Sequence, residues 1–168
     1  MNNTAIITGS FDPITTGHED LVRRAAAIFD RVYIVILANA EKRSGMFRGE
    51  DRLIFAQKVA ENLTSTGAGQ VEAVLYGGLT SDAAHMLGAN FIVRGVRNPS
   101  DFDYEYGIAN IMKRFDPRLE TIFIPSAPEL ACVSATYVRE LLKYGFSLDG
   151  SVPDCTAALV RKTYETNK

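Results

Sequence analysis

Five short apolar runs rich in β-branched residues, each separated from the next by a longer segment, constrain the fold of this chain more than any other feature. The runs are continuous and do not alternate between apolar and polar residues, which is typical of strands buried on both faces of a sheet. We therefore expect strands at residues 5–7, 32–37, 71–75, 91–93 and 121–124.

Segments with helical periodicity lie between these strands. Apolar residues recur at helical spacing over residues 21–29 and 53–63. Alternation of strand and helix predicts right-handed crossovers, so we expect a doubly wound α/β fold with a parallel sheet of about five strands and helices on both faces. Ligands in such sheets bind beyond the carboxyl ends of the strands. A loop at 125–133 precedes expected helices at 134–144 and from 153 to about 164.

Length and charge limit what such a fold can do. With 168 residues, 46% of them hydrophobic, the chain fits one domain that spans residues 1–168 and ends in a helical segment from about 134. Eighteen basic and twenty acidic residues are mixed along the chain, so we expect local anion sites and no nucleic-acid partner.

Two further observations concern location and redox state. No apolar run approaches the roughly 20 residues that span a bilayer, and the first residues lack the layout of a signal peptide, so we expect no membrane partner and a cytoplasmic location. Cys132 and Cys155 form neither a CxxC pair nor a metal-ligand set with the two histidines. We interpret both as reduced thiols that fill space.

The loop between the first strand and the first helix is the most informative stretch. Gly9 follows a buried strand, where glycine permits a backbone path closed to other residues, and Gly17 stands where free helix amides favour phosphate. His18, in the first turn of that helix, can donate a hydrogen bond to an anion there. The alternative is an ordinary turn at Asp12-Pro13, with His18 as a polar residue on a helix end.

Residues 8–18 together resemble the signature of the nucleotidyltransferase superfamily, in which a glycine and a small hydroxyl residue precede Phe-Asp and a Gly-His pair follows. Many members carry HxGH, whereas this chain has Thr15 at the first of these positions. The TxGH form is similar to the phosphopantetheine adenylyltransferases, which have a Rossmann-like fold and act late in coenzyme A synthesis. The resemblance spans residues 4 to about 140. It implies that His18 is catalytic, that Ser10 and Phe11 contact the nucleotide, and that Ser10 also positions the acceptor phosphate.

Lys42 is the next candidate residue. It lies in the loop after the second strand, before a Met-Phe pair that the family shares. A lysine is a compact charge suited to a migrating phosphoryl group, and the resemblance implies that Lys42 is catalytic and contacts the acceptor. A solvated surface lysine is the alternative.

Two arginines follow the fourth strand in segments that resemble the family's RGxR and DFxYE motifs. An arginine at a strand end, a glycine that permits close approach and a second arginine make a guanidinium fork for phosphate oxygens. The resemblance implies that Arg94 contacts the acceptor phosphate and that the nucleotide is contacted by Gly95, Val96, Arg97 and Glu105. For Glu105 the alternative is an acidic residue favoured by the dipole of a helix start.

A last motif, at residues 133–139, resembles the family's Ile-Ser-Ser-Ser/Thr segment at a helix start. Hydroxyls and free amides there suit triphosphate oxygens, although Ser134 can also be a plain N-cap. The resemblance implies nucleotide contacts from Leu130, Ser134, Ala135 and Thr136. Because Ala135 stands where a serine is common, only its amide can contribute. Thr80 is implied as a contact of the pantetheine arm.

The reaction implied by the resemblance is attack by the phosphate of 4'-phosphopantetheine on the α-phosphorus of ATP, with Mg²⁺ bound through ATP and no protein metal ligand. The resemblance also implies a homohexamer. Two alternatives remain. One is a related transferase for nicotinamide mononucleotide, or for a sugar or glycerol phosphate with CTP, although Thr15 argues against the CTP group. The other is a nucleotide or coenzyme A binding protein without turnover, against which Ser10, His18, Lys42 and Arg94 argue together.

Overall fold

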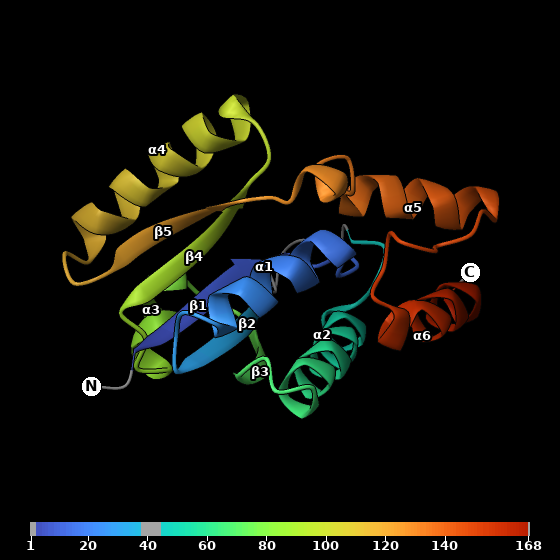
Figure 1. The fold of residues 1–168 in the computed structure, drawn as a ribbon, viewed down its shortest axis with the longest axis horizontal. Helices are drawn as coiled ribbons and strands as arrows, with labels where there is room; N and C mark the ends of the chain where they lie inside the picture. Colours follow the sequence, from blue (N-terminus) through green and yellow to red (C-terminus); the bar gives the residue numbers. More distant parts are fainter. Residues whose placement is uncertain (1–2, 38–44, 168) are drawn as a thin grey trace.

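Strands and helices alternate along the computed structural model, which describes residues 3–37 and 45–167 (Figure 1). The strands are β1 (Thr4–Gly9), β2 (Arg31–Leu37), β3 (Gln70–Tyr76), β4 (Phe91–Val96) and β5 (Glu120–Pro125). The helices are α1 (Thr16–Ala26), α2 (Gly49–Ser65), α3 (Thr80–Met86), α4 (Pro99–Phe115), α5 (Ala135–Tyr144) and α6 (Asp154–Thr166), with a 3-10 turn at Pro128–Leu130. None of the helices in the described ranges is long and apolar enough to cross a membrane.

The strands form one parallel sheet in the order β3-β2-β1-β4-β5, which confirms the predicted doubly wound α/β fold. From β1 the chain winds outward through β2 to β3, and then returns to the other side of β1 to add β4 and β5. The winding direction therefore reverses between β1 and β4. In open α/β sheets a ligand binds at such a reversal, outside the carboxyl ends of the strands.

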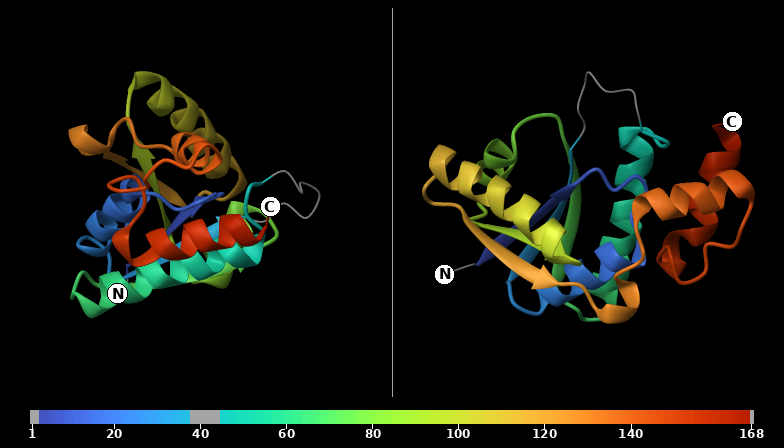
Figure 2. Two further views of the ribbon diagram at one scale, coloured as in Figure 1. Left: turned by 90° about the vertical axis from the view of Figure 1, so that its right-hand side faces the viewer. Right: turned by 90° about the horizontal axis from the view of Figure 1, so that it is seen from above.

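Alternate residues of the central strand β1 face two separate hydrophobic layers. Ala5 and Ile7 pack in the layer that contains α1, α2, α5 and α6, whereas Ile6 packs in the layer that contains α3 and the C-terminal part of α4. Helix α6 lies along α2 in this first layer (Figure 2). Because both faces of the strand are covered, its apolar run is continuous, and its polar loop emerges at the carboxyl end.

Three helices begin near that edge with a side-chain cap. Thr15, Asn98 and Ser134 are the N-caps of α1, α4 and α5, and each side chain accepts a hydrogen bond from the amide three residues later, at 3.3, 2.9 and 3.1 Å. These residue types satisfy an otherwise unpaired helix donor. The remaining amides and the positive ends of the helix dipoles favour an anion at this edge.

Some details differ from the sequence-based expectations. Strand β4 continues to Val96, because Arg94 and the two residues after it pair with β5, so the arginine motif begins inside the strand. Helix α1 ends at Ala26, before the apolar periodicity does. Cys132 and Cys155 are free, as expected, but both are exposed and do not fill space.

Candidate functional site

A cavity of about 570 Å³ lies where the carboxyl ends of β1 and β4 separate. Strand β1 pairs with β2 along its whole length, but with β4 only at Ala5 and Ile6. Beyond Ile6 the two strands are no longer paired, which opens the sheet at its topological switch point. The ends of β1, β4 and β5 and the first turns of α1, α4 and α5 line this cavity.

The charges of the lining side chains favour an anion. They comprise one histidine, four arginines and three carboxylates: His18, Arg24, Arg94, Arg97, Arg139, Asp20, Asp101 and Glu105. The net charge of the chain is −2, so this basic surplus is local. Together with the helix N-termini it makes the cavity suited to phosphate groups.

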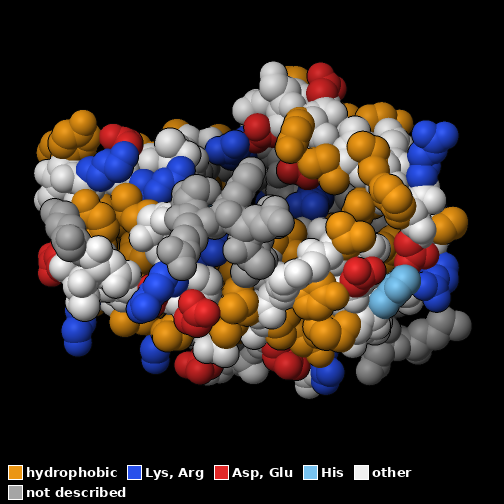
Figure 3. Space-filling model, turned by 180° about the vertical axis from the view of Figure 1, so that it is seen from behind, with side chains coloured by type: hydrophobic (Ala, Val, Ile, Leu, Met, Phe, Trp, Pro, Cys, Tyr) orange, Lys and Arg blue, Asp and Glu red, His pale blue; other side chains and the backbone are white. Residues whose placement is uncertain are grey.

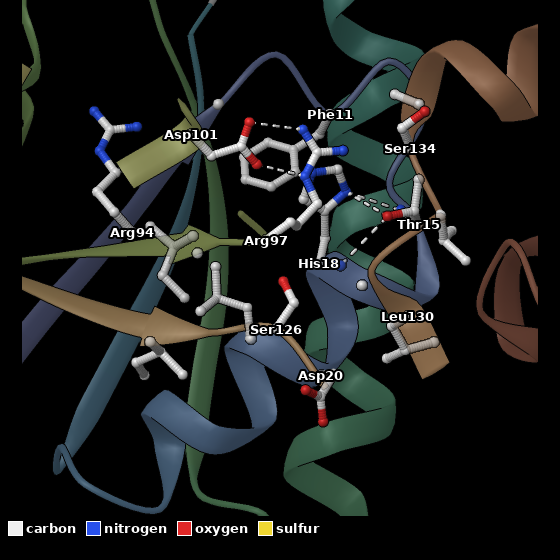
Figure 4. A pocket seen from close by; sticks show the side chains of 18 of the residues that line it. Phe11, Thr15, His18, Asp20, Arg94, Arg97, Asp101, Ser126, Leu130 and Ser134 are labelled. Atoms are coloured by element: carbon white, nitrogen blue, oxygen red, sulfur yellow. Dashed lines mark hydrogen bonds and ion pairs between the residues drawn. The ribbon is translucent and has the colours of Figure 1, made fainter. Parts of the chain in front are cut away.

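His18 lines the cavity from the first turn of α1 (Figure 4). Its Nδ1 accepts a hydrogen bond from the backbone N–H of Thr15 at 3.0 Å, and its ring meets that of Phe11 edge to face, with centroids 5.0 Å apart. Desolvation and then the positive charge of Arg97 lower the pKa of His18 from 6.5 to about 4. The imidazole is therefore neutral at pH 7 and can donate a hydrogen bond without carrying a positive charge.

The unusual backbone of the loop after β1 is at Phe11, and not at Gly9 where we expected it. Phe11 has a φ of 45°, in the left-handed region that few residues other than glycine adopt, and its side chain is buried. A Cβ at Gly9 would lie 3.3 Å from the Phe11 ring. Gly9 therefore provides space for Phe11, which in turn packs against His18.

Both arginines of the motif are paired with carboxylates of α4. Arg97 donates from Nε to Asp101 Oδ2 at 2.7 Å and from Nη2 to Oδ1 at 3.3 Å (Figure 4), and this hydrogen bonding lowers the pKa of Asp101. Arg94 Nε lies 3.4 Å from Glu105 Oε2, and Arg94 Nη1 donates to the Thr8 carbonyl at 3.0 Å. Helix α4 thus orients both guanidinium groups, and Glu105 contacts an arginine in addition to lining the cavity.

The first turn of α5 forms the opposite wall. Ser134, Ala135 and Thr136 line the cavity there, together with Leu130 from the preceding turn. The Ser134 hydroxyl caps the helix, which confirms the N-cap interpretation, and Ser134 also lines the cavity. Thr136 Oγ1 accepts a hydrogen bond from Arg139 Nη2 at 2.9 Å.

Asp12 has a role that the sequence reasoning missed, since it treated this residue as part of a turn. Its Oδ2 and Oδ1 accept hydrogen bonds from the backbone N–H groups of Met46 and Phe47, both at 2.9 Å. Its carbonyl accepts one from Arg139 Nη1 at 2.8 Å. Asp12 therefore joins the loop after β1 to the chain before α2 and to α5. Aspartate is so common in turns that no local pattern marks these long-range contacts.

Most of the predicted site residues lie together. The cavity is lined by Ser10, Phe11, His18, Arg94, Gly95, Arg97, Glu105, Leu130, Ser134, Ala135 and Thr136. Val96 and Thr80 are not among its lining residues, and Thr80 begins α3 on the other face of the sheet. Lys42 lies outside the described residues. A Cβ at Gly95 would lie 3.1 Å from Leu21, so this glycine makes room for α1.

Comparison with known proteins gives the family. Residues 6–141 match the family model described as cytidylyltransferase-like. A phosphopantetheine adenylyltransferase from Nitrobacter winogradskyi is 35% identical over 164 residues, which cover 98% of this chain and 99% of that protein. One from Flavobacterium psychrophilum is 40% identical over 150 residues, which cover 89% and 95%. This chain belongs to the phosphopantetheine adenylyltransferase family. The resemblance seen in the motifs thus extends over nearly the whole chain.

A solved structure supports the fold of this family member. The Plasmodium falciparum nicotinic acid mononucleotide adenylyltransferase, complexed with NaAD, superposes with a TM-score of 0.67 at 13% identity, covering 99% of this chain and 96% of that one. At this identity the likeness concerns the fold alone. It confirms the Rossmann-like nucleotidyltransferase architecture.

Proposed function

We propose that this chain transfers the adenylyl group of ATP to 4'-phosphopantetheine, giving dephospho-coenzyme A and pyrophosphate in coenzyme A biosynthesis. The observation that carries the proposal is the gathering of His18, Arg94 and Arg97 around one cavity, with the first turns of α1 and α5 in its wall. Such a cavity suits a triphosphate and a second phosphate side by side. The relatives that carry the name of this activity match along most of the chain.

The chemistry needs charge placement and no enzyme nucleophile. The acceptor phosphate attacks the α-phosphorus in line and displaces pyrophosphate, so no covalent enzyme intermediate forms. Negative charge on the α-phosphoryl oxygens is stabilised by preorganised donors. His18 supplies one donor from its neutral ring, and the free amides of α1 supply others.

Each site residue is assigned to the nucleotide or to the acceptor, and Ser10 is assigned to both. The nucleotide contacts are assigned to Ser10, Phe11, His18, Gly95, Val96, Arg97, Glu105, Leu130, Ser134, Ala135 and Thr136. The acceptor contacts are assigned to Ser10, Lys42, Thr80 and Arg94. The division is supported by the two arginines, because their planar groups are held by α4 and are suited to phosphate oxygens.

Lys42 is assigned to the migrating phosphoryl group, where a compact ammonium stabilises charge. The Lys42→Gln variant is expected to lower kcat about 100-fold, as is typical when a charge-stabilising donor is lost. Lys58→Gln is the matched control, because Lys58 is exposed on α2 and its ammonium lies 4.0 Å from Glu61. Equal turnover in the two variants would remove Lys42 from the mechanism.

Mg²⁺ would enter this scheme with ATP and would be held mostly by triphosphate oxygens and water. It would supply positive charge that neutralises part of the triphosphate. The cavity fits this arrangement, since its carboxylates Asp20, Asp101 and Glu105 are each within ion-pair distance of an arginine. In the described part of the chain, no group of three or more His, Cys, Asp or Glu residues could hold a metal ion.

The decisive experiment measures pyrophosphate release with ATP and 4'-phosphopantetheine, and identifies the product by mass spectrometry. His18→Ala should lower turnover at least about 10²-fold while ATP still binds, because one preorganised donor is lost. His85→Ala is the control, since His85 lies on α3 and pairs with Asp116 outside the cavity. Near-normal turnover in His18→Ala contradicts the role of the imidazole.

The same assay tests the alternatives. Nicotinamide mononucleotide, glycerol phosphate with CTP and a sugar phosphate with CTP are offered in turn. Pyrophosphate release with one of these and none with 4'-phosphopantetheine would replace the proposed acceptor. ATP binding without pyrophosphate release for any acceptor would indicate a binding protein. The relatives named above do not favour these alternatives.

A homohexamer in the cytoplasm completes the proposal. Helix α4 has no buried residue, and large apolar side chains on it are exposed, including Tyr104 at 69% and Phe115 at 74%. Hydrophobic side chains gather over the half of the molecular face that holds α3 and α4 (Figure 3). Apolar surface of this kind marks a protein contact. Light scattering of the purified protein should give six times the 18.4 kDa chain mass, and a Phe115→Glu variant should give a smaller particle.

A further inference from the structure

Thr15 contacts the imidazole of His18 through two groups at once. Its backbone N–H donates to His18 Nδ1 at 3.0 Å, and its Oγ1 lies 3.0 Å from the same nitrogen. Thr15 Oγ1 also accepts the backbone N–H of His18 at 3.3 Å, which closes a capping box at the start of α1 (Figure 4). Thr15 is only 2% exposed, so water does not compete for these contacts.

The protons in this arrangement can be assigned from the donors. A backbone N–H can only donate, so His18 Nδ1 must offer its lone pair to Thr15. The Thr15 hydroxyl accepts the His18 amide with one lone pair, and its own proton remains free to point at Nδ1. A neutral imidazole that receives these bonds at Nδ1 carries its single proton on Nε2.

We propose that Thr15 is a positioning residue, whose hydroxyl and amide together hold His18 as the neutral, Nε2-protonated tautomer and leave that N–H for the ligand in the cavity. The tautomer follows from contacts in the protein without a ligand and does not depend on the proposed function. Only its kinetic consequence rests on the proposed adenylyl transfer. A donor fixed before the substrate binds needs no reorganisation during the reaction.

The surroundings of the ring act in the same direction. Phe11 meets it edge to face, and Arg97, held by Asp101, is the cation that opposes protonation of the ring. Asp101 accepts two hydrogen bonds from Arg97 and so holds this cation in place. Thr15 therefore decides which nitrogen carries the proton, and the charged neighbours help to keep the ring neutral.

Nitrogen NMR of the free protein reports the tautomer directly. The signals are simple to assign, because the chain has only two histidines and His85 serves as an internal reference. In the unmodified protein, His18 should show an unprotonated Nδ1 and a protonated Nε2 between pH 6 and 8. A charged His18, or one protonated at Nδ1, in this range overturns the proposal.

Variants separate positioning from simple capping. Thr15→Val keeps the shape and the backbone N–H but loses the hydroxyl, so the pKa of His18 should rise toward its ordinary value and kcat should fall about tenfold, with the KM for ATP unchanged. Thr15→Ser should restore both. Thr16→Val is the matched control, because it loses a hydroxyl bond to the Gly150 carbonyl and leaves the ring untouched.

A second substitution at Thr15 tests whether the residue acts only as the N-cap of α1. Thr15→Asp keeps an acceptor for the His18 amide but cannot donate to Nδ1, so the pKa of His18 should rise while the helix stays capped. If Thr15→Val lowers only the melting temperature and both Thr15→Val and Thr15→Asp leave the His18 titration unchanged, Thr15 is a cap and the inference is wrong. If His18 shows the expected tautomer but the protein does not transfer an adenylyl group, the proposed function is wrong and the inference about Thr15 stands.

Discussion

Acid should destabilise this protein through His18, and a His18→Gln variant isolates the effect. Glutamine is a favoured third residue of a capping box, so its amide oxygen can accept the Thr15 backbone N–H that His18 Nδ1 accepts in the native protein. The variant therefore keeps the helix start but lacks a titrating group. Its stability at pH 7 should be close to that of the native protein.

The magnitude follows from the pKa of His18 in the two states. It is about 4 in the folded protein, against 6.5 in the unfolded chain. Between these values the unfolded chain binds a proton that the folded protein does not, so the free energy of unfolding falls as the pH falls. Relative to His18→Gln, the native protein should lose about 2 kcal/mol by pH 5 and about 3 kcal/mol by pH 4. At pH 7 almost none of this difference remains.

Urea unfolding followed by circular dichroism at several pH values measures the difference. Protein concentration is held constant, because association shifts apparent stability. His85→Gln is the control, since its ring is 46% exposed and lies outside the cavity. Parallel pH curves for the native protein and His18→Gln would show that the folded protein accepts the proton readily, and the argument for a neutral imidazole would fail.

Three smaller effects can be tested by routine methods. Gly69→Ala should lower the free energy of unfolding by about 2 kcal/mol, because the φ of Gly69 is +131° and a Cβ would lie 2.7 Å from a backbone carbonyl of α1. Gly107→Ala, in open space on α4, should raise the free energy of unfolding by about 1 kcal/mol. Denaturant unfolding curves that shift in the same direction for both variants would contradict this. Asp12→Asn turns one acceptor of a backbone N–H into a donor and should cost about 1–3 kcal/mol, seen as a lower melting temperature. Partial desolvation raises the pKa of the Cys155 thiol, so iodoacetamide should modify it more slowly than Cys132 although both residues are exposed, and equal rates by peptide mass spectrometry would refute this.

The strands were predictable because their signal is local. Each expected run lies inside a strand. The expected burial on both faces holds for β1 and β2 but not for β5, in which only Ile124 is buried and Ile122 is 37% exposed. The ends of the strands were harder to predict from the sequence. Strand β4 extends through Arg94 to Val96 only because β5 pairs with those residues, and no local pattern reports that partner. Similarly, Phe29 is buried in the main core although α1 ends at Ala26.

The site shows the same division. The place of His18 in the first turn of a helix was predictable from a Gly-His pair after a buried strand, and its inclusion in the site came from the family resemblance. The bend at Phe11 was not, because the left-handed conformation is expected at glycine and is imposed here by packing. The pairing of Arg97 with Asp101 was also missed, although a spacing of four residues and opposite charges could have indicated it.

The separation of β1 from β4 also explains why an arginine stands at position 94. The two strands pair only at Ala5 and Ile6, so the carbonyl of Thr8, further along β1, has no partner on β4. Without another donor it would be a buried, unsatisfied acceptor. Arg94 Nη1 reaches across the gap and donates to it at 3.0 Å, while Nε lies 3.4 Å from Glu105. A guanidinium has five N–H groups, so these two contacts leave others for a phosphate. The unpaired ends of β1 and β4 therefore have two effects, because they open the cavity and also leave free the Thr8 carbonyl that holds Arg94 in its wall.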